Sequence, residues 1–234
     1  MACGEGKIIG SKKKTEHRED NMEKRILCFG DSNTWGYNAL DSSRFQNDVR
    51  WTKLLQRMLE EGYEILEEGL SGRTAVCDDP LNEGLRGLDY IYPCVMTHAP
   101  LDLVIIILGT NDAKERYSLT PNNISAGITR LASKVKGTMT GRDGNDPLIL
   151  VVAPPAIGRG YNETPALLSM GREFDTKTRE MIPYLKKMAE LNGLAYLNTD
   201  ETVPMNNIDY MHLNPAGHAK MASVMEEKIL ELLG

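Results

Sequence analysis

The sequence predicts an α/β fold: one three-layer α/β/α domain built around a five-stranded parallel sheet. Short apolar runs alternate along the chain with segments whose apolar residues recur at helical spacing. One of these runs, residues 103–108, is unbroken, as is typical of a central strand covered by helices on both faces. Strands that alternate with helices favour right-handed crossovers into a single parallel sheet.

The predicted elements follow one another in a regular order. Strands are expected at residues 26–29, 63–66, 103–108, 148–152 and 194–197. Amphipathic helices are expected at residues 51–59, 81–95, 121–135, 174–188 and 215–232. Thr120-Pro121 and Asn214-Pro215 each pair an N-cap residue with a proline at the first helical position. Pro183 lies inside the fourth helix and is expected to kink or split it.

This pattern is consistent with a flavodoxin-like strand order, 2-1-3-4-5. Ligands of such sheets bind at the carboxyl ends of the strands, where the order reverses between strands 1 and 3. The domain is expected to span residues 24–234. Residues 1–23 are mainly polar and carry three consecutive lysines, so we expect them to form a disordered N-terminal extension.

Composition excludes several classes of protein. The 27 basic and 33 acidic residues give a net charge of −6, which argues against a nucleic-acid partner. No apolar run approaches the roughly 20 residues of a membrane span. The four cysteines contain no CxxC pair and favour a reducing compartment, so we expect a cytoplasmic protein, with export left open. The four histidines are too few and wrongly spaced for a zinc site, and no phosphate-binding loop is present, so no metal or cofactor is expected.

Polar residues gather where the predicted strands end. The segments concerned are residues 30–34, 69–74, 109–112 and 209–212. Taken singly they are weak evidence, because a serine in such a turn is usually a helix cap and a lone histidine is usually structural. Three of the segments adjoin strands 2, 1 and 3, which the strand order makes neighbours, so their side chains should converge on one cleft.

These segments carry a family resemblance. Four parts of the chain resemble the four signature blocks of the SGNH (GDSL) hydrolases. They are GDS at residues 30–32, Gly72, GTND at residues 109–112, and the pair Asp209 and His212. The chain is also similar to the bacterial aryl-esterase/acyltransferase branch of that family. The similar segments are RILCFGDSNTWGY, EEGLSGRT, LDLVIIILGTND and DYMHLNPAGH. The resemblance extends from about residue 24 to the end of the chain, and it implies the SGNH hydrolase fold.

The resemblance implies a role for each of five residues. Ser32 would be the nucleophile, His212 the general base and Asp209 the carboxylate that orients His212. The backbone N–H groups of Ser32 and Gly72 and the side-chain amide of Asn111 would form the oxyanion hole. Acyl transfer needs these groups, because a serine hydroxyl is a poor nucleophile without a base and the developing oxyanion needs donors.

The function implied is a cofactor-independent serine esterase. It would hydrolyse short-chain acetyl-type or aryl esters through an acyl-enzyme, with acyl transfer as a further reaction. A carbohydrate O-acetylesterase is the alternative, followed by a thioesterase or lysophospholipase. A non-catalytic ligand-binding domain on the same scaffold is the non-enzyme alternative, and five intact site residues argue against it.

Six further residues are candidates for supporting or structural roles. Trp35 and Tyr37 follow the nucleophile and are predicted either to line the substrate pocket or simply to pack. Asp112 is expected to anchor its loop, and Arg73 either to support the site or to be solvated. His98 and His218 are expected to be structural.

The last expectation concerns assembly. Residues 154–170 are predicted to be irregular and contain exposed aliphatic side chains, which favours contact with another subunit. Relatives in the resembled branch form oligomers, so a homo-oligomer is expected.

Overall fold

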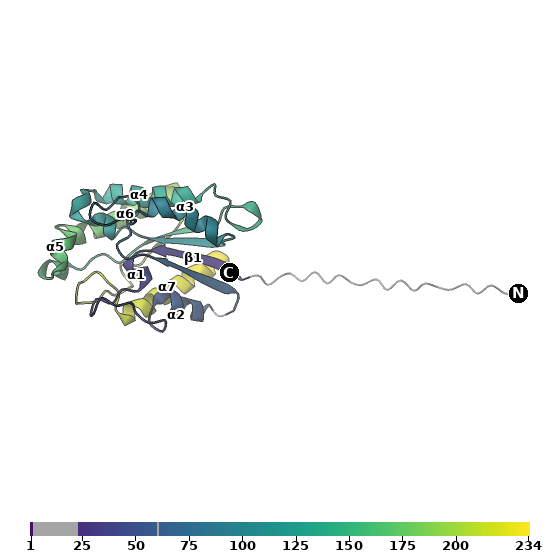
Figure 1. Ribbon diagram of the computed structural model, residues 1–234, viewed down its shortest axis with the longest axis horizontal. Coiled ribbons are helices and arrows are strands. Elements are labelled where there is room, and N and C mark those ends of the chain that lie inside the picture. The colour runs from purple at the N-terminus through teal and green to yellow at the C-terminus, as the bar shows by residue number, and fades with distance from the viewer. Residues whose placement is uncertain (2–22, 60) are drawn as a thin grey trace.

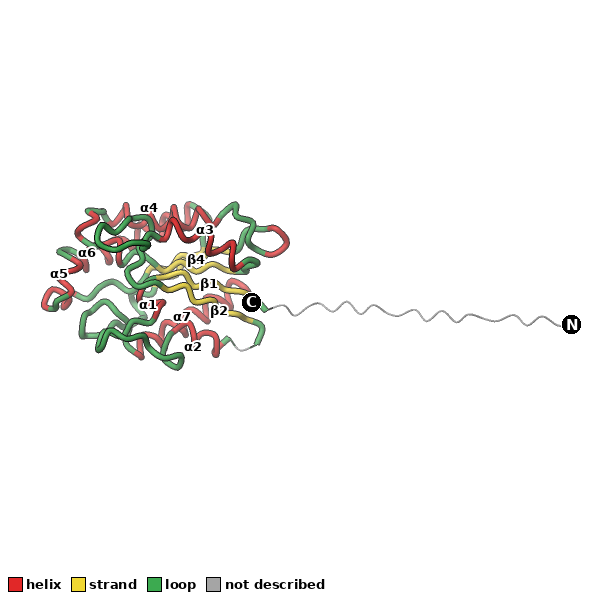
Figure 2. The backbone as a smooth tube through the Cα atoms, in the orientation of Figure 1, coloured by secondary structure: helices red, strands yellow, loops and turns green. Residues whose placement is uncertain are grey.

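The computed structural model describes residue 1, residues 23–59 and residues 61–234. Most of the predicted N-terminal extension lies outside the described residues. Figure 1 shows a central sheet with helices on both of its faces, and Figure 2 shows the strands as the middle layer. Within the described residues, no helix combines the length and the apolar character needed to cross a bilayer.

The sheet has the predicted topology. Its strands lie in the order β2-β1-β3-β4-β5, and every pairing is parallel. Gly30, the last residue of β1, pairs with Gly69 of β2 and with Ile107 of β3, so these three strands end side by side. The strand bounds are β1 Lys24–Gly30, β2 Tyr63–Gly69, β3 Leu103–Ile107, β4 Leu148–Ala153 and β5 Ala195–Asn198.

Two layers of helices bury the two faces of the sheet. The layer α3, α4 and α6 covers the face to which Leu27 and Phe29 of β1 point. The layer α2 and α7 covers the face of Ile26 and Cys28. The bounds are α1 Ser32–Trp35, α2 Trp51–Met58, α3 Gly87–His98, α4 Pro121–Val135, α5 Ala166–Met170, α6 Phe174–Leu191 and α7 Pro215–Leu233. The caps of α4 and α7 are as predicted: Thr120 Oγ1 accepts from the N–H of Asn123, and Asn214 Oδ1 accepts from that of Gly217.

One helix prediction was wrong in its start, and of the two effects expected of Pro183 one, a split helix, does not occur. The helix predicted over residues 81–95 begins only at Gly87, because Gly84 adopts a left-handed conformation (φ 74°) and Leu81 is 72% exposed rather than on a buried stripe. Pro183 does not split α6, which runs through it. The proline is on the exposed face, where water can satisfy the backbone carbonyl that loses its partner.

The segment from residue 154 to residue 170 is more ordered than predicted. It contains the 3₁₀ helix Arg159–Glu163 and the short helix α5. Ile157 and Tyr161 are fully buried in the core of the same chain, so they are not available to a second subunit. Leu168 is the exception, with an exposure of 91%.

Candidate active site

The predicted nucleophile lies at a sharp turn between β1 and α1. Asp31 caps α1, since its carboxylate accepts the N–H of Asn33 at 3.0 Å, and Ser32 is the first helical residue. Gly36 ends the helix after one turn in a left-handed conformation (φ 91°), which glycine adopts readily. Gly69 allows β2 to pass close by, because a Cβ there would lie 2.2 Å from the backbone nitrogen of Trp35. The turn therefore presents Ser32 at the carboxyl edge of the sheet.

Ser32, His212 and Asp209 form a hydrogen-bonded chain. The distance from Ser32 Oγ to His212 Nε2 is 3.0 Å, and that from His212 Nδ1 to Asp209 Oδ2 is 2.6 Å. Burial alone would raise the pKa of Asp209, but the hydrogen bond and the charge of His212 outweigh it and hold that pKa at about 2. The carboxylate is therefore ionised at neutral pH and can orient and stabilise a protonated imidazole.

Asn206 organises the loop that carries Asp209 and His212. Its Oδ1 accepts the N–H groups of Ile208 and Asp209, and its Nδ2 donates to Asp209 Oδ1 and to the carbonyl of His212. Asn206 was not predicted as a site residue from the sequence. The only available signal was its position three residues before Asp209.

Asn33 ties that loop to the nucleophile turn. Its Oδ1 accepts the N–H of Leu213 at 2.9 Å, and its Nδ2 donates to the carbonyl of Met211 at 3.2 Å. Asn33, the residue after Ser32, thus hydrogen-bonds the backbone on both sides of His212. Its side chain is buried, so the distance between serine and histidine depends on packed structure rather than on a mobile loop.

Gly72 and Asn111 lie in the wall of the same small cavity as Ser32 and His212. The cavity has a volume of about 220 Å³. Gly72 has a φ of 87°, a conformation that other residues rarely adopt. The Asn111 side chain is buried and makes no hydrogen bond to any described residue, so its amide is free to donate to a ligand. The structure thus brings all five predicted residues together.

The remaining predicted residues are placed as follows. Tyr37 lines the cavity and its ring lies 4.3 Å from that of His212, whereas Trp35 lies outside the lining, beside the Arg44 guanidinium. Asp112 anchors the loop after β2 by accepting the N–H of Ala75, and burial raises its pKa to about 7.

Arg73 and His218 are both buried. Arg73 is not solvated: it donates to the carbonyl of Gly30 at 3.0 Å and lies over the ring of Phe29. His218 accepts the N–H of Trp51, which is 167 residues away in the sequence, at 3.3 Å; it thus links α7 to α2, which is consistent with the structural role expected for it.

Lys114 and Met170 are further cavity-lining residues that the sequence analysis missed. Lys114 is buried, and burial lowers its pKa. Met170 ends α5 and comes from the segment after β4. Lys114 could have been suspected from its position three residues after Asn111. Met170 could not, because its place in the cavity depends on how a distant segment folds over the cleft.

The family comparison agrees with this geometry. The family described as GDSL-like Lipase/Acylhydrolase matches residues 26–225. The chain belongs to this family. It is therefore a carboxylic ester hydrolase with the SGNH α/β fold, as the sequence predicted. A search of curated proteins returns no match.

Solved structures of similar proteins include two esterases. An aryl esterase of M. smegmatis is 35% identical, with a TM-score of 0.84 over 90% of this chain and 100% of that one. A carbohydrate acetylesterase from Sinorhizobium meliloti is 33% identical, with a TM-score of 0.84 over 90% and 100% of the two chains. A lipase/acylhydrolase from Enterococcus faecalis, 19% identical with a TM-score of 0.62 over 88% and 95%, shares the fold.

Proposed function

We propose that this hydrolase is a serine esterase for short acyl groups, with Ser32 as nucleophile, His212 as general base and Asp209 as the orienting carboxylate. The supporting observation is the chain of two hydrogen bonds from Asp209 through His212 to Ser32. The imidazole lies between the carboxylate and the hydroxyl, which is the arrangement that activates a serine.

The reaction then follows from the positions of these groups. His212 Nε2 takes the hydroxyl proton as Ser32 Oγ attacks the ester carbonyl carbon. The carbonyl oxygen becomes an oxyanion that accepts from the N–H groups of Ser32 and Gly72 and from the Asn111 amide. His212 returns the proton to the leaving alkoxide or phenoxide, and the acyl group remains on Ser32. Water, or an alcohol in acyl transfer, then attacks by the same steps in reverse.

Cavity size supports a short acyl group. A volume of about 220 Å³ lies below the roughly 300–1,000 Å³ of sites that hold drug-sized ligands. Acetyl esters of phenols and of carbohydrates are the two leading substrate classes, because solved relatives at similar identity carry one or the other description. The class of leaving group is decided by assay.

Two measurements test the proposal. Ser32→Ala is expected to fold normally and to lose kcat by at least about 10⁴-fold, because only binding and the oxyanion donors remain. Ser133→Ala, an exposed serine on α4, is the matched control and should keep wild-type kcat. A Ser32→Ala protein that retained a tenth of wild-type kcat would rule out this nucleophile.

Substrate class is tested with p-nitrophenyl acetate, butyrate and octanoate beside acetylated xylan. We expect kcat/KM to fall as the acyl chain lengthens. A preference for octanoate would contradict the short-acyl assignment. Faster turnover of acetylated xylan than of the aryl acetate would favour the carbohydrate acetylesterase.

We also propose a cytoplasmic homo-oligomer. The free cysteines Cys28, Cys77 and Cys94 fit a reducing compartment. The exposed Leu168 side chain lies on α5, the helix whose last residue, Met170, lines the catalytic cavity. Light scattering is expected to give a multiple of 26.1 kDa, and Leu168→Ser to shift it toward the monomer. A monomer mass for the wild-type protein would reject self-association.

A further inference from the structure

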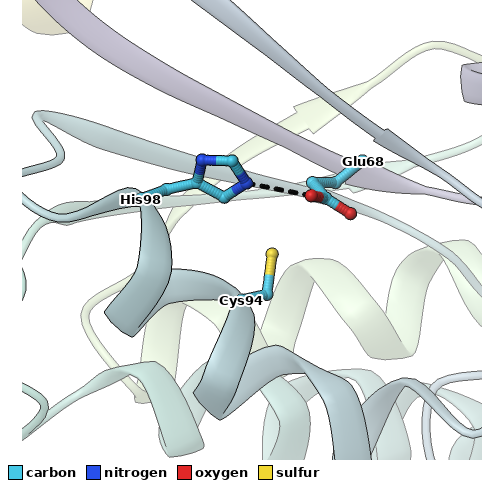
Figure 3. A group of neighbouring side chains, drawn as sticks. All are labelled: Glu68, Cys94 and His98. Atoms are coloured by element: carbon cyan, nitrogen blue, oxygen red, sulfur yellow. Dashed lines mark hydrogen bonds and ion pairs between the residues drawn. The ribbon is translucent and has the colours of Figure 1, made fainter.

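A second carboxylate–imidazole pair lies outside the catalytic cavity. Glu68 is in β2, one residue before its end, and His98 is the last residue of α3. His98 Nε2 lies 2.9 Å from Glu68 Oε1. Cys94 lies one helical turn before His98, and Figure 3 shows its sulfur pointing toward the space between the other two side chains. One ligand atom from each residue lies within 4.8 Å of the other two.

The three donors are those of a borderline divalent metal. Thiolate, imidazole and carboxylate together are a ligand set that zinc accepts, with bonds of about 2.0–2.3 Å. In a tetrahedral site such bonds place ligand atoms roughly 3.3–3.8 Å apart. Separations of up to 4.8 Å therefore need only small side-chain movements to close around an ion. Spacing of four residues on α3 already puts Cys94 and His98 on one face of the helix.

Access and local charge also favour a cation. Cys94 is 1% exposed and forms the inner wall, whereas the side chains of Glu68 and His98 are 19% and 26% exposed. Glu68 also lines a cavity of about 540 Å³ with Tyr90 and Arg73, through which an ion and a water ligand can enter. The carboxyl end of α3 adds a partial negative charge.

The opposing charge is Arg73. Its guanidinium is held away in other contacts, donating to backbone carbonyls of Gly30 and Glu68 and lying 4.0 Å from the Phe29 ring centroid. Two ligand anions and one divalent ion would leave the cluster neutral beside this cation.

We propose that Glu68, Cys94 and His98 form a three-ligand site for a zinc-like divalent ion, with its fourth coordination position open to the cavity beside Tyr90. The site is separate from the catalytic residues, across the loop that carries Arg73. The proposal differs from the sequence expectation of no metal site, which rested on histidine spacing, because the contact between β2 and α3 that brings Glu68 to His98 is not evident from that spacing.

The test is a titration of the full-length protein with cobalt(II), after treatment with a chelator and its removal. We expect one equivalent to produce a thiolate-to-cobalt charge-transfer band in the near ultraviolet and the strong visible bands of four-coordinate cobalt. One equivalent of zinc should remove both. Cys94→Ser should abolish the near-ultraviolet band, while the matched variant Cys77→Ser should keep it. His98→Gln should weaken binding at least about tenfold.

Two results would overturn the proposal. One is the absence of a charge-transfer band at millimolar cobalt, and the other is a band that survives in Cys94→Ser. Thermal melting in chelator shows whether each variant folds. If Cys94→Ser does not, Glu68→Gln and His98→Gln carry the decision, since unchanged cobalt affinity in both would equally reject the site. None of these readouts depends on esterase activity.

Discussion

The protein contains two clusters that share nearly the same parts. Each has a carboxylate hydrogen-bonded to an imidazole, at 2.6 Å in Asp209–His212 and at 2.9 Å in Glu68–His98. Each also has a potential nucleophile nearby, Ser32 in the first and Cys94 in the second. Only the first has the imidazole between the carboxylate and the nucleophile, so the two clusters differ in the order in which their groups are connected.

In the first cluster the imidazole is the central group. It contacts Asp209 through Nδ1 and Ser32 through Nε2, so a proton can pass from hydroxyl to imidazole while the carboxylate stabilises the resulting charge. In the second cluster Glu68 is central: it contacts His98 Nε2, and its charge adds to burial, the larger cause, in raising the pKa of the Cys94 thiol. That arrangement opposes a thiolate unless a cation is present, which suits a metal site and not a nucleophile.

Among the changes that test this comparison, Asp209→Asn should have the largest effect, a loss of kcat. An amide in place of the carboxylate can donate to His212 Nδ1, which favours the tautomer whose Nε2 carries the proton and cannot accept from Ser32. We expect kcat to fall by about 10⁴-fold with the fold unchanged. Asp48→Asn, at an exposed position, is the control. Steady-state kinetics checks this, and a loss below tenfold would mean that the carboxylate does not act through His212.

Cys94 should be far less reactive than an ordinary cysteine. With its pKa raised to about 12, its thiolate fraction at pH 8 is on the order of 10³-fold below that of a free cysteine with a pKa of about 8.5. We expect iodoacetamide to label Cys94 in the native, metal-free protein at least about 10³-fold more slowly than in urea. Mass spectrometry of the peptide measures both rates. Comparable rates would show that the second cluster activates its nucleophile after all.

In the proposed mechanism, three donors near the first cluster stabilise the oxyanion. Asn111→Ala removes one of them, and we expect kcat to fall by about 10²–10³-fold with little change in KM. Asn122→Ala, on the exposed face of α4, is a matched control. A rise in KM at constant kcat would instead assign the amide to ground-state binding.

His218 shows what burial does to an imidazole whose hydrogen-bond partner is a backbone N–H. Burial lowers its pKa from 6.5 to about 4. Between these values the unfolded chain binds a proton that the folded chain does not, so stability falls as pH decreases, by up to about 3 kcal/mol. We expect urea unfolding at pH 7 and pH 4.5 to show a larger loss for the wild-type protein than for His218→Gln. Equal losses would contradict the shift. Other titrating groups, including Asp112, are common to both proteins.

The sheet order and the convergence of the polar segments could be predicted because both depend on local signals, whereas the role of each site residue was inferred from the family resemblance. Apolar runs mark the strands, and the polar blocks follow strand ends that parallel pairing must bring together. The start of α3 could not be predicted correctly. Leu81 and Leu85 fall at helical spacing, but the chain turns at Gly84 before the helix begins. Lys114, Met170 and the grouping of Glu68 with Cys94 and His98 depend on tertiary packing, which periodicity does not encode.

The central claim is that Ser32 carries the acyl group. The most direct measurement is the intact mass of the protein after treatment with phenylmethylsulfonyl fluoride, followed by peptide mapping. We expect one sulfonyl group on Ser32 in the wild-type protein with matching loss of esterase activity, much slower labelling in Asp209→Asn and no label in Ser32→Ala. Inactivation with the label on another residue, or equal labelling of Ser32→Ala, would contradict it.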